Sequence, residues 1–391
     1  MRTEGDLIKI NEWLLPLSWL YGMGVRFRNW LFDVGLKKSH SFDIPVISVG
    51  NITVGGSGKT PHVEYLVRLL REKVHVAVLS RGYKRKGKGF ILADEHTTME
   101  EIGDEPFQMH RKFPDVAVAV EKSRVKGIEL LQEGATTKDV EVIVLDDAFQ
   151  HRYVKPGINI LLVDYHRLFI YDKLLPAGRL REPVSGKRRA DIVIVTKCPK
   201  DLKPMEYRVL TKALDLYPYQ ELYFTTINYC APKYVFTGSE VEMEELSAYH
   251  VLLLSGIASP KHLEKDLEGK FASMRTMTFP DHHMFKHKDI IRINEEYDAL
   301  PQPRVIITTE KDAVRLRAVD GLEDEVKAHL MELPIKVDFM LEQEETFKNK
   351  IISYVRKNSR NSILAKSKDV HKPQDSHHTG NRPGTISFGN Y

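Results

Sequence analysis

The chain of 391 residues contains little cysteine, only Cys198 and Cys230. Two cysteines with no paired spacing indicate neither a disulfide framework nor a cysteine-rich metal site, and this usage fits a reducing compartment. The formal net charge is only +4, which gives no support for a nucleic-acid partner. No repeat of fixed period occurs, so repeat architectures are excluded.

A hydrophobic run long enough to cross a bilayer is also absent. The longest uncharged run of the apolar segment 7–32 extends from Trp13 to Val25, thirteen residues, whereas a spanning helix needs about 20. Acidic residues before this run and the lack of a small-residue cleavage site argue against a secretory signal. The segment contains all three tryptophans, with Arg26 and Arg28 nearby. This pattern is typical of a helix lying in a membrane interface, and equally of an amphipathic helix packed on the core.

What the chain does contain is an ordinary globular composition, 42% hydrophobic and 29% charged residues. Its length allows two domains. The polar stretch 358–391 shows no periodicity, and we expect it to be disordered.

The most informative stretch is rich in glycine. The β-branched run 46–49 predicts a buried strand, a glycine-rich loop follows, and the pattern from Pro61 to Arg71 predicts a helix. Strand, loop and helix in this order form a phosphate-binding loop, in which Lys59 reaches the β- and γ-phosphates and Thr60 offers its hydroxyl to Mg²⁺. The loop departs from the usual pattern at its first position, where threonine replaces glycine. The residues predicted to bind nucleotide are Thr53, Val54, Gly55, Gly56, Ser57, Gly58, Lys59 and Thr60.

A second apolar strand, 142–145, ends in Asp146 and Asp147. Carboxylates at this place hold Mg²⁺ in phosphate-loop enzymes, and two adjacent acids repel each other unless a cation lies near. In a later loop, Arg181 is a candidate for stabilising phosphoryl oxygens and Glu182 for joining the metal ligands.

The roles of two further groups of polar residues remain open from the residues alone. Asp104 begins a predicted helix, where a capping role is the simpler interpretation. Asp281, His282 and His283 follow a strand, and they suit a metal cluster, a proton relay or neither.

The pattern of predicted strands and helices changes after residue 227. We predict five segments: an N-terminal amphipathic helix (1–35), a nucleotide domain (36–227), a linker (228–245), a second, smaller α/β lobe (246–357) and the tail (358–391). In the second lobe, strands are predicted over 251–254, 274–279 and 305–308, each followed by a helical pattern.

Six separated motifs together resemble the tetraacyldisaccharide 4′-kinase family of lipid A biosynthesis over residues 7–355. Family members also carry threonine where this chain has Thr53, and they more often carry glycine where it has Ala148. The motifs are Gly50–Pro61, Ser80–Tyr83, Gly103–Pro106, Asp146–Arg152, Leu180–Pro183 and Asp281–His283.

The resemblance implies a kinase that transfers the γ-phosphoryl group of ATP to the 4′-hydroxyl of a tetraacylated glucosamine disaccharide 1-phosphate, forming lipid IVA. It implies an α/β fold with a phosphate-loop domain, a second lobe, a β-hairpin linker and an N-terminal interfacial helix on the cytoplasmic face of the bacterial inner membrane. Beyond ATP, Mg²⁺ and the glycolipid, we expect neither nucleic acid nor an obligate protein partner.

The resemblance also assigns roles to residues. Asp104 matches the family's general base and His282 the histidine paired with it, although His283 also fits the pattern. Lys59 and Arg181 complete the catalytic set. We further expect the glycolipid to contact Asn51, Arg81, Tyr83 and Arg124.

Two alternative functions are also considered for the sequence. A membrane-associated ATPase or GTPase switch that delivers a metal would use Asp281–His283 as ligands, but Pro199 stands where guanine-specific enzymes carry aspartate. A non-catalytic lipid-binding protein has no need for the complete set of Lys59, Thr60 and paired aspartates.

Overall fold

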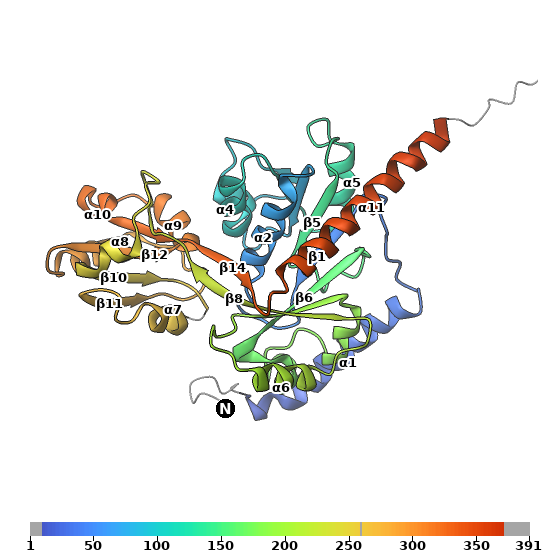
Figure 1. Ribbon diagram of the computed structural model, residues 1–391, viewed down its shortest axis with the longest axis horizontal. Helices are drawn as coiled ribbons and strands as arrows, with labels where there is room; N and C mark the ends of the chain where they lie inside the picture. The colour runs from blue at the N-terminus through green and yellow to red at the C-terminus, as the bar shows by residue number, and fades with distance from the viewer. Residues whose placement is uncertain (1–9, 259, 371–391) are drawn as a thin grey trace, which may run out of the picture.

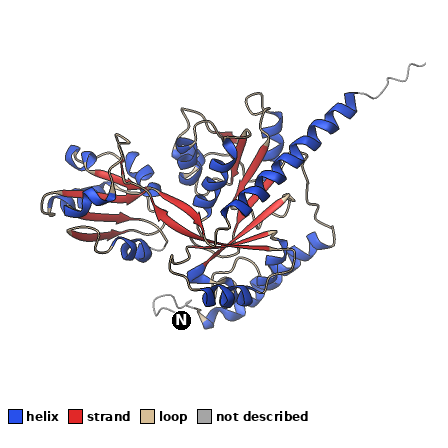
Figure 2. Cartoon of the chain, viewed as in Figure 1, coloured by secondary structure: helices blue, strands red, loops and turns tan. Residues whose placement is uncertain are grey.

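Two β-sheets organise the chain, one in each of two α/β lobes (Figures 1 and 2). The computed structural model describes residues 10–258 and 260–370. Within these residues, no helix combines the length and apolarity that crossing a membrane requires.

The sheet of the first lobe has nine strands in the order β14-β8-β7-β6-β1-β5-β2-β4-β3. Its central strands are parallel and buried on both faces, which explains their continuous apolar runs. Because β1 and β5 are neighbours, the phosphate-binding loop and the Asp146–Asp147 pair leave the sheet side by side. The strands are β1 (Val46–Gly50), β2 (Val76–Ser80), β3 (Ile91–Leu92), β4 (Ala117–Val120), β5 (Val142–Asp146), β6 (Ile158–Asp164), β7 (Ile192–Thr196), β8 (Glu221–Tyr229) and β14 (Ile335–Phe339).

Helices cover both faces of this sheet. On one face α2, α4 and α11 share a hydrophobic cluster with the strands, and on the other α5 and α6 contribute to two further clusters. The helices of this lobe are α2 (Lys59–Arg71), α3 (Met99–Ile102), α4 (Asp104–Lys112), α5 (Arg124–Glu133), α6 (Pro204–Leu214) and α11 (Glu344–Val370).

The second lobe is a smaller sheet of five strands in the order β11-β10-β12-β13-β9. Alternate side chains of β10 and β12 point to opposite faces, one packed against α7 and the other against α8, α9 and α10. Its elements are β9 (Lys233–Tyr234), β10 (His250–Ser255), α7 (Pro260–Leu267), β11 (Ser273–Thr278), α8 (His287–Asp298), β12 (Arg304–Thr309), α9 (Glu310–Arg317), α10 (Asp324–Ala328) and β13 (Leu330–Leu333).

The connection between the lobes differs from the hairpin expected within 228–245. It consists of β8 and β14, which pair antiparallel, while part of 228–245 joins the second sheet as β9. The two strands cross from one lobe to the other in Figure 1. The side chains of Asn228 and Asp338 form a hydrogen bond across this pair, and the two residues are 110 positions apart in the chain. A pairing over that distance leaves no local signal in the sequence.

The end of the chain also differs from the expectation. β14 returns to the first sheet, and α11 packs Phe347, Ile351 and Val355 into the core of the first lobe, so the second lobe ends before β14. Residues 358–370 continue α11 rather than being disordered, and 371–391 lie outside the described residues. The helical pattern was missed there because polar residues interrupt it.

The N-terminal segment contains the expected helix. Residues 1–9 lie outside the described residues; a short 3₁₀ turn (Glu12–Leu14) precedes α1 (Leu15–Asp33), and Pro16 occupies the first helical turn. α1 runs along the edge of the first lobe (Figure 1), held by hydrogen bonds such as Ser18 Oγ to the carbonyl of Leu174.

Candidate active site

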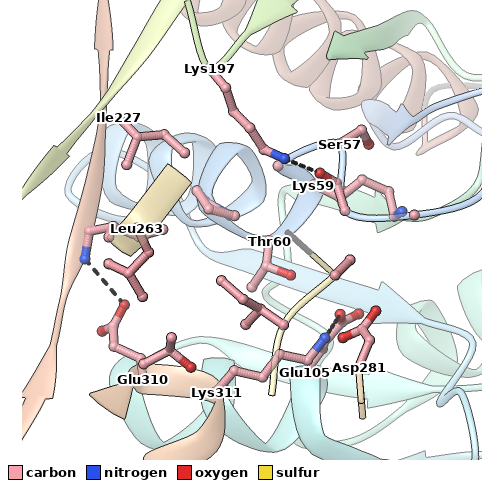
Figure 3. A pocket seen from close by; sticks show the side chains of 18 of the residues that line it. Ser57, Lys59, Thr60, Glu105, Lys197, Ile227, Leu263, Asp281, Glu310 and Lys311 are labelled. Carbon is pink, nitrogen blue, oxygen red and sulfur yellow. Dashed lines mark hydrogen bonds and ion pairs between the residues drawn. The ribbon is translucent and has the colours of Figure 1, made fainter. Parts of the chain in front are cut away.

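A cavity of about 450 Å³ lies between the two lobes, and we call it the interlobe cavity. Its wall includes residues 54–60 of the phosphate loop, as the sequence predicts, but Thr53 is not part of the lining. Figure 3 looks into the cavity, with Thr60 of the loop on one side and Lys311 of the second lobe on the other.

The phosphate loop is fixed by its neighbours. The amide of Asn51, which is fully buried, donates to Ser57 Oγ at 2.7 Å, and Val54 N donates to the carbonyl of Arg179 at 2.8 Å. Gly58 adopts a left-handed conformation with φ of 80°, which glycine reaches without strain, and α2 begins directly after it. The loop therefore presents the N-terminus of α2 to the cavity.

Two residues that hold this loop were not predicted. Lys197 Nζ donates to the carbonyl of Gly56 and pairs with Asp164 at 2.8 Å. The buried ring of His62 contacts the carbonyl of Gly58 through Nδ1 at 2.7 Å, and burial lowers its pKa to about 4. The available signal for Lys197 was its place directly after an apolar strand, the place that Asp147 occupies after β5.

Asp147 lies beside the predicted catalytic cations. Its backbone is left-handed, with φ of 46°, and its carboxylate is 3.6 Å from Lys59 Nζ and 3.2 Å from Arg181 Nη1. Burial alone works to raise the pKa of Asp147, but these two cations outweigh it and lower that pKa. A left-handed aspartate is a strained arrangement of the kind found at functional sites.

Asp146 has the features of a cation ligand. Its side chain is 1% exposed, and burial, with Glu105 and Asp147 nearby, raises its pKa to about 7. One oxygen accepts from Ser80 Oγ at 3.2 Å, whereas Oδ1 has no hydrogen-bond partner. A buried carboxylate oxygen left without a donor, at the end of the strand next to β1, fits a divalent cation such as Mg²⁺.

Several predicted residues lie elsewhere. Glu182 pairs with Arg189 at 2.6 Å and does not line the cavity, so its place among the metal ligands stays a prediction. The guanidinium of Arg124 is buried and donates to the carbonyls of Glu121 and Asp146, which fixes the end of β5.

Of the residues predicted to contact the glycolipid, only Tyr83 lines the cavity. It is 60% exposed, and its ring makes an edge-type contact with the ring of His282, with 5.5 Å between ring centroids. Asn51 is buried in the loop support, and Arg81 is exposed outside the cavity lining.

The two lobes meet at Asp104 and His282. Asp104 is the first residue of α4, and its Oδ2 is 2.9 Å from Nδ1 of His282, which stands on the loop after β11. His282 is left-handed, with φ of 59°. Burial alone works to raise the pKa of Asp104, but the hydrogen bond from His282 and the charges of Lys311 and Arg315 hold it below its usual range.

His283 is not the partner of Asp104. Its Nε2 is 2.9 Å from Asp289 of α8, and its ring stacks on Phe279. Among the described residues, no group of three or more histidine, cysteine or acidic side chains is arranged to hold a metal ion, which removes the support for a metal cluster at Asp281–His283.

Comparisons with known proteins all point to one family. A family model described as tetraacyldisaccharide-1-P 4′-kinase matches residues 10–356. Proteins named tetraacyldisaccharide 4′-kinase from Phocaeicola vulgatus and Bacteroides thetaiotaomicron are 58% and 50% identical, over 92% and 94% of this chain and 99% and 100% of their own lengths.

A solved structure is also similar. It is the "apo" form of LpxK from Aquifex aeolicus in complex with ATP, which is 34% identical and superposes with a TM-score of 0.68 over 88% of this chain and 98% of that one. By its sequence and its fold, the chain belongs to the tetraacyldisaccharide 4′-kinase family.

Proposed function

We propose that this chain transfers the γ-phosphoryl group of ATP to the 4′-hydroxyl of a tetraacylated glucosamine disaccharide 1-phosphate, giving lipid IVA. The observation that carries this proposal is a carboxylate–histidine pair, Asp104 and His282, of which His282 lines the same cavity as the phosphate loop. A nucleotide site alone suits many enzymes, whereas a candidate base beside it suits transfer to an alcohol.

In the reaction, the bond between the γ-phosphorus and the β–γ bridging oxygen breaks, and a bond from the 4′-oxygen to that phosphorus forms. The hydroxyl proton passes to the carboxylate of Asp104, and ADP leaves with the electron pair of the broken bond. The phosphate-loop amides and Lys59 hold the phosphates, and Arg181 neutralises the charge on the moving phosphoryl group. Such acid–base assistance is typically worth ~10²–10⁴ in rate.

Thr60 and Asp146 are the residues that would hold Mg²⁺, with Asp147 beside them. When bound, the cation supplies charge neutralisation on the phosphates. We place the adenine ring against the apolar part of the cavity wall, which includes Ile335 together with Ile227 and Leu263. The last two are labelled in Figure 3.

We place the protein on the cytoplasmic face of the bacterial inner membrane through α1. One face of this helix packs Ser18 and Gly22 on the first lobe, while Trp13 and Trp19 are 93% and 62% exposed. Exposed tryptophans on a helix that packs against the first lobe suit the headgroup region of a bilayer that contains the glycolipid.

The proposal is tested by mass analysis of the glycolipid after incubation with ATP, Mg²⁺ and the purified chain. We expect one added phosphate on the sugar that carries the 4′-hydroxyl.

Lys59→Ala should lower turnover by a factor of 10³ or so while the melting temperature stays close to that of the wild type. ATP hydrolysis without a phosphorylated lipid would favour the rival ATPase, and near-normal turnover of folded Lys59→Ala would refute the site.

A further inference from the structure

Helices α4 and α9 face each other across the lobe boundary with complementary charges. α4 contributes the adjacent acids Asp104 and Glu105, and α9 contributes Lys311 and Arg315, which are one helical turn apart. His282 lies between these groups.

We propose that Lys311 and Arg315 are positioning residues that hold His282 as the neutral tautomer with its proton on Nδ1 and keep Asp104 ionised and oriented. The second lobe thereby supplies, besides His282, the two cations that keep the carboxylate of Asp104 ionised and oriented. The inference rests on the proposed function only where Asp104 is taken as the base.

Lys311 determines the tautomer of His282. Its Nζ donates to Glu105 Oε1 at 2.8 Å and lies 3.2 Å from Nε2 of His282. An ammonium group has donors and no acceptor, so Nε2 must accept and carries no proton. The ring proton is therefore on Nδ1, which donates to Asp104 Oδ2 at 2.9 Å. Nη2 of Arg315 also lies 3.4 Å from Nδ1, but it makes its shorter hydrogen bond to Asp104.

Arg315 fixes the carboxylate from the other side. Its side chain is 1% exposed; Nη1 donates to Asp312 at 2.8 Å and Nη2 to the same Asp104 oxygen that accepts from His282. Asp312 is itself fully buried and accepts from Gly256 N at 2.8 Å. The guanidinium is therefore held rigidly, and Asp104 accepts two hydrogen bonds from the second lobe.

The charges around the pair explain why this state is stable. Asp281 and Glu105 are the acids that face His282 and Lys311, and Asp312 pairs with Arg315. The ring of Tyr83 contacts the ring of His282. Lys311 and Arg315 are the two cations whose charges act on Asp104. The same two cations favour the ionised form of Asp104 and lower its pKa.

The pH dependence of kcat tests this inference through Lys311→Met, which removes the ammonium and keeps much of the side-chain volume. Without Lys311, the pKa of Asp104 rises because one of its neighbouring cations is lost, and Nε2 of His282 loses the donor from which it accepts. We expect the acid limb of the kcat profile to move to higher pH by about one unit, with little change in KM for ATP.

The matched control is Lys112→Met. Lys112 also joins α4 to α9, through Glu310, but it does not contact Asp104 or His282. Its substitution should leave the acid limb where the wild type has it. If Lys311→Met lowers kcat at every pH without moving the limb, Lys311 only clamps the lobes and the inference fails.

The ¹⁵N shifts of the His282 ring test the tautomer without activity. We expect a proton on Nδ1 in the wild type and a redistribution toward Nε2 or the protonated ring in Lys311→Met; a wild-type proton on Nε2 would overturn the proposal.

Arg315→Lys preserves the charge beside Asp312 and so protects folding, but it cannot bond both carboxylates as the planar guanidinium does. We expect it to lower kcat about tenfold, and unchanged kcat would exclude a positioning role. Wild-type kcat in Asp104→Asn would instead refute the base, while the ring shifts would still decide the tautomer.

Discussion

At the scale of single residues, the sequence predicts the candidate site where a motif gives a residue a single characteristic role. Lys59, Thr60 and the Asp146–Asp147 pair are such residues, and the structure brings them to one edge of the sheet. The choice between His282 and His283 could not be made from the sequence, because adjacent histidines carry the same signal. The left-handed backbone at His282 and the Asp289 partner of His283 decide it.

His62 gives a prediction for stability against pH. Its pKa is about 4 in the folded protein and about 6.5 in an unfolded chain, so only the unfolded chain takes up a proton between these values. The free energy of unfolding should therefore fall as pH drops from 6.5 to 4, with His62 contributing about 3 kcal/mol of the loss. In His62→Gln this contribution should vanish.

Urea unfolding at several pH values measures the effect of His62. His75→Gln, at an exposed position, controls for the loss of a histidine. An equally steep fall of stability in His62→Gln and in the wild type would contradict the assignment.

At the scale of elements, local patterns predicted most strands and helices to within a few residues. Strands β1, β5 and β7 are buried runs bounded by polar residues, which is the pattern that single-sequence reasoning detects best. The residues of α11 up to 357 were assigned to the second lobe and those from 358 to a tail, because the packing partners of this helix come from strands far away in the chain.

The placement of α11 predicts a large effect of one aromatic residue. The Phe347 ring is 1% exposed and packs against Phe339 and Tyr223, with centroid distances of 4.6 and 5.3 Å. Phe347→Ala should destabilise the first lobe by about 3–5 kcal/mol. Removing residues 371–391 should leave stability unchanged. A melting temperature for Phe347→Ala within a degree or so of the wild type would show that α11 does not belong to this core.

For α1, we predict a loss of membrane binding without loss of folding. Glutamates in place of Trp13, Trp19 and Phe27, which are 93%, 62% and 60% exposed, should abolish flotation with anionic vesicles. KM should rise for the glycolipid and not for ATP. Ile291→Glu, on an exposed position of α8, serves as the control. Flotation of the triple variant at the wild-type level would mean that α1 is an ordinary helix of the first lobe.

At the scale of the whole molecule, the two-lobe α/β architecture was predictable, but the way the lobes join was not. The chain leaves the first lobe through β8 and returns through β14, and these strands pair with each other. The alternation of βα units reveals two sheets, whereas the pairing of strands about 110 residues apart depends on the complete fold. For the same reason, only the structure shows that α4 and α9 meet and bring Lys311 and Arg315 to Asp104.

The central claim is that a group from each lobe, Asp104 and His282, acts as one unit in phosphoryl transfer. The most direct test is a double-mutant cycle on kcat with Asp104→Ala, His282→Ala and the double variant, each checked for ATP affinity and melting temperature. We predict a strong loss of kcat in Asp104→Ala, a smaller loss in His282→Ala, and a double variant little worse than Asp104→Ala, all with ATP affinity nearly unchanged. Losses that multiply fully in the double variant would contradict the account.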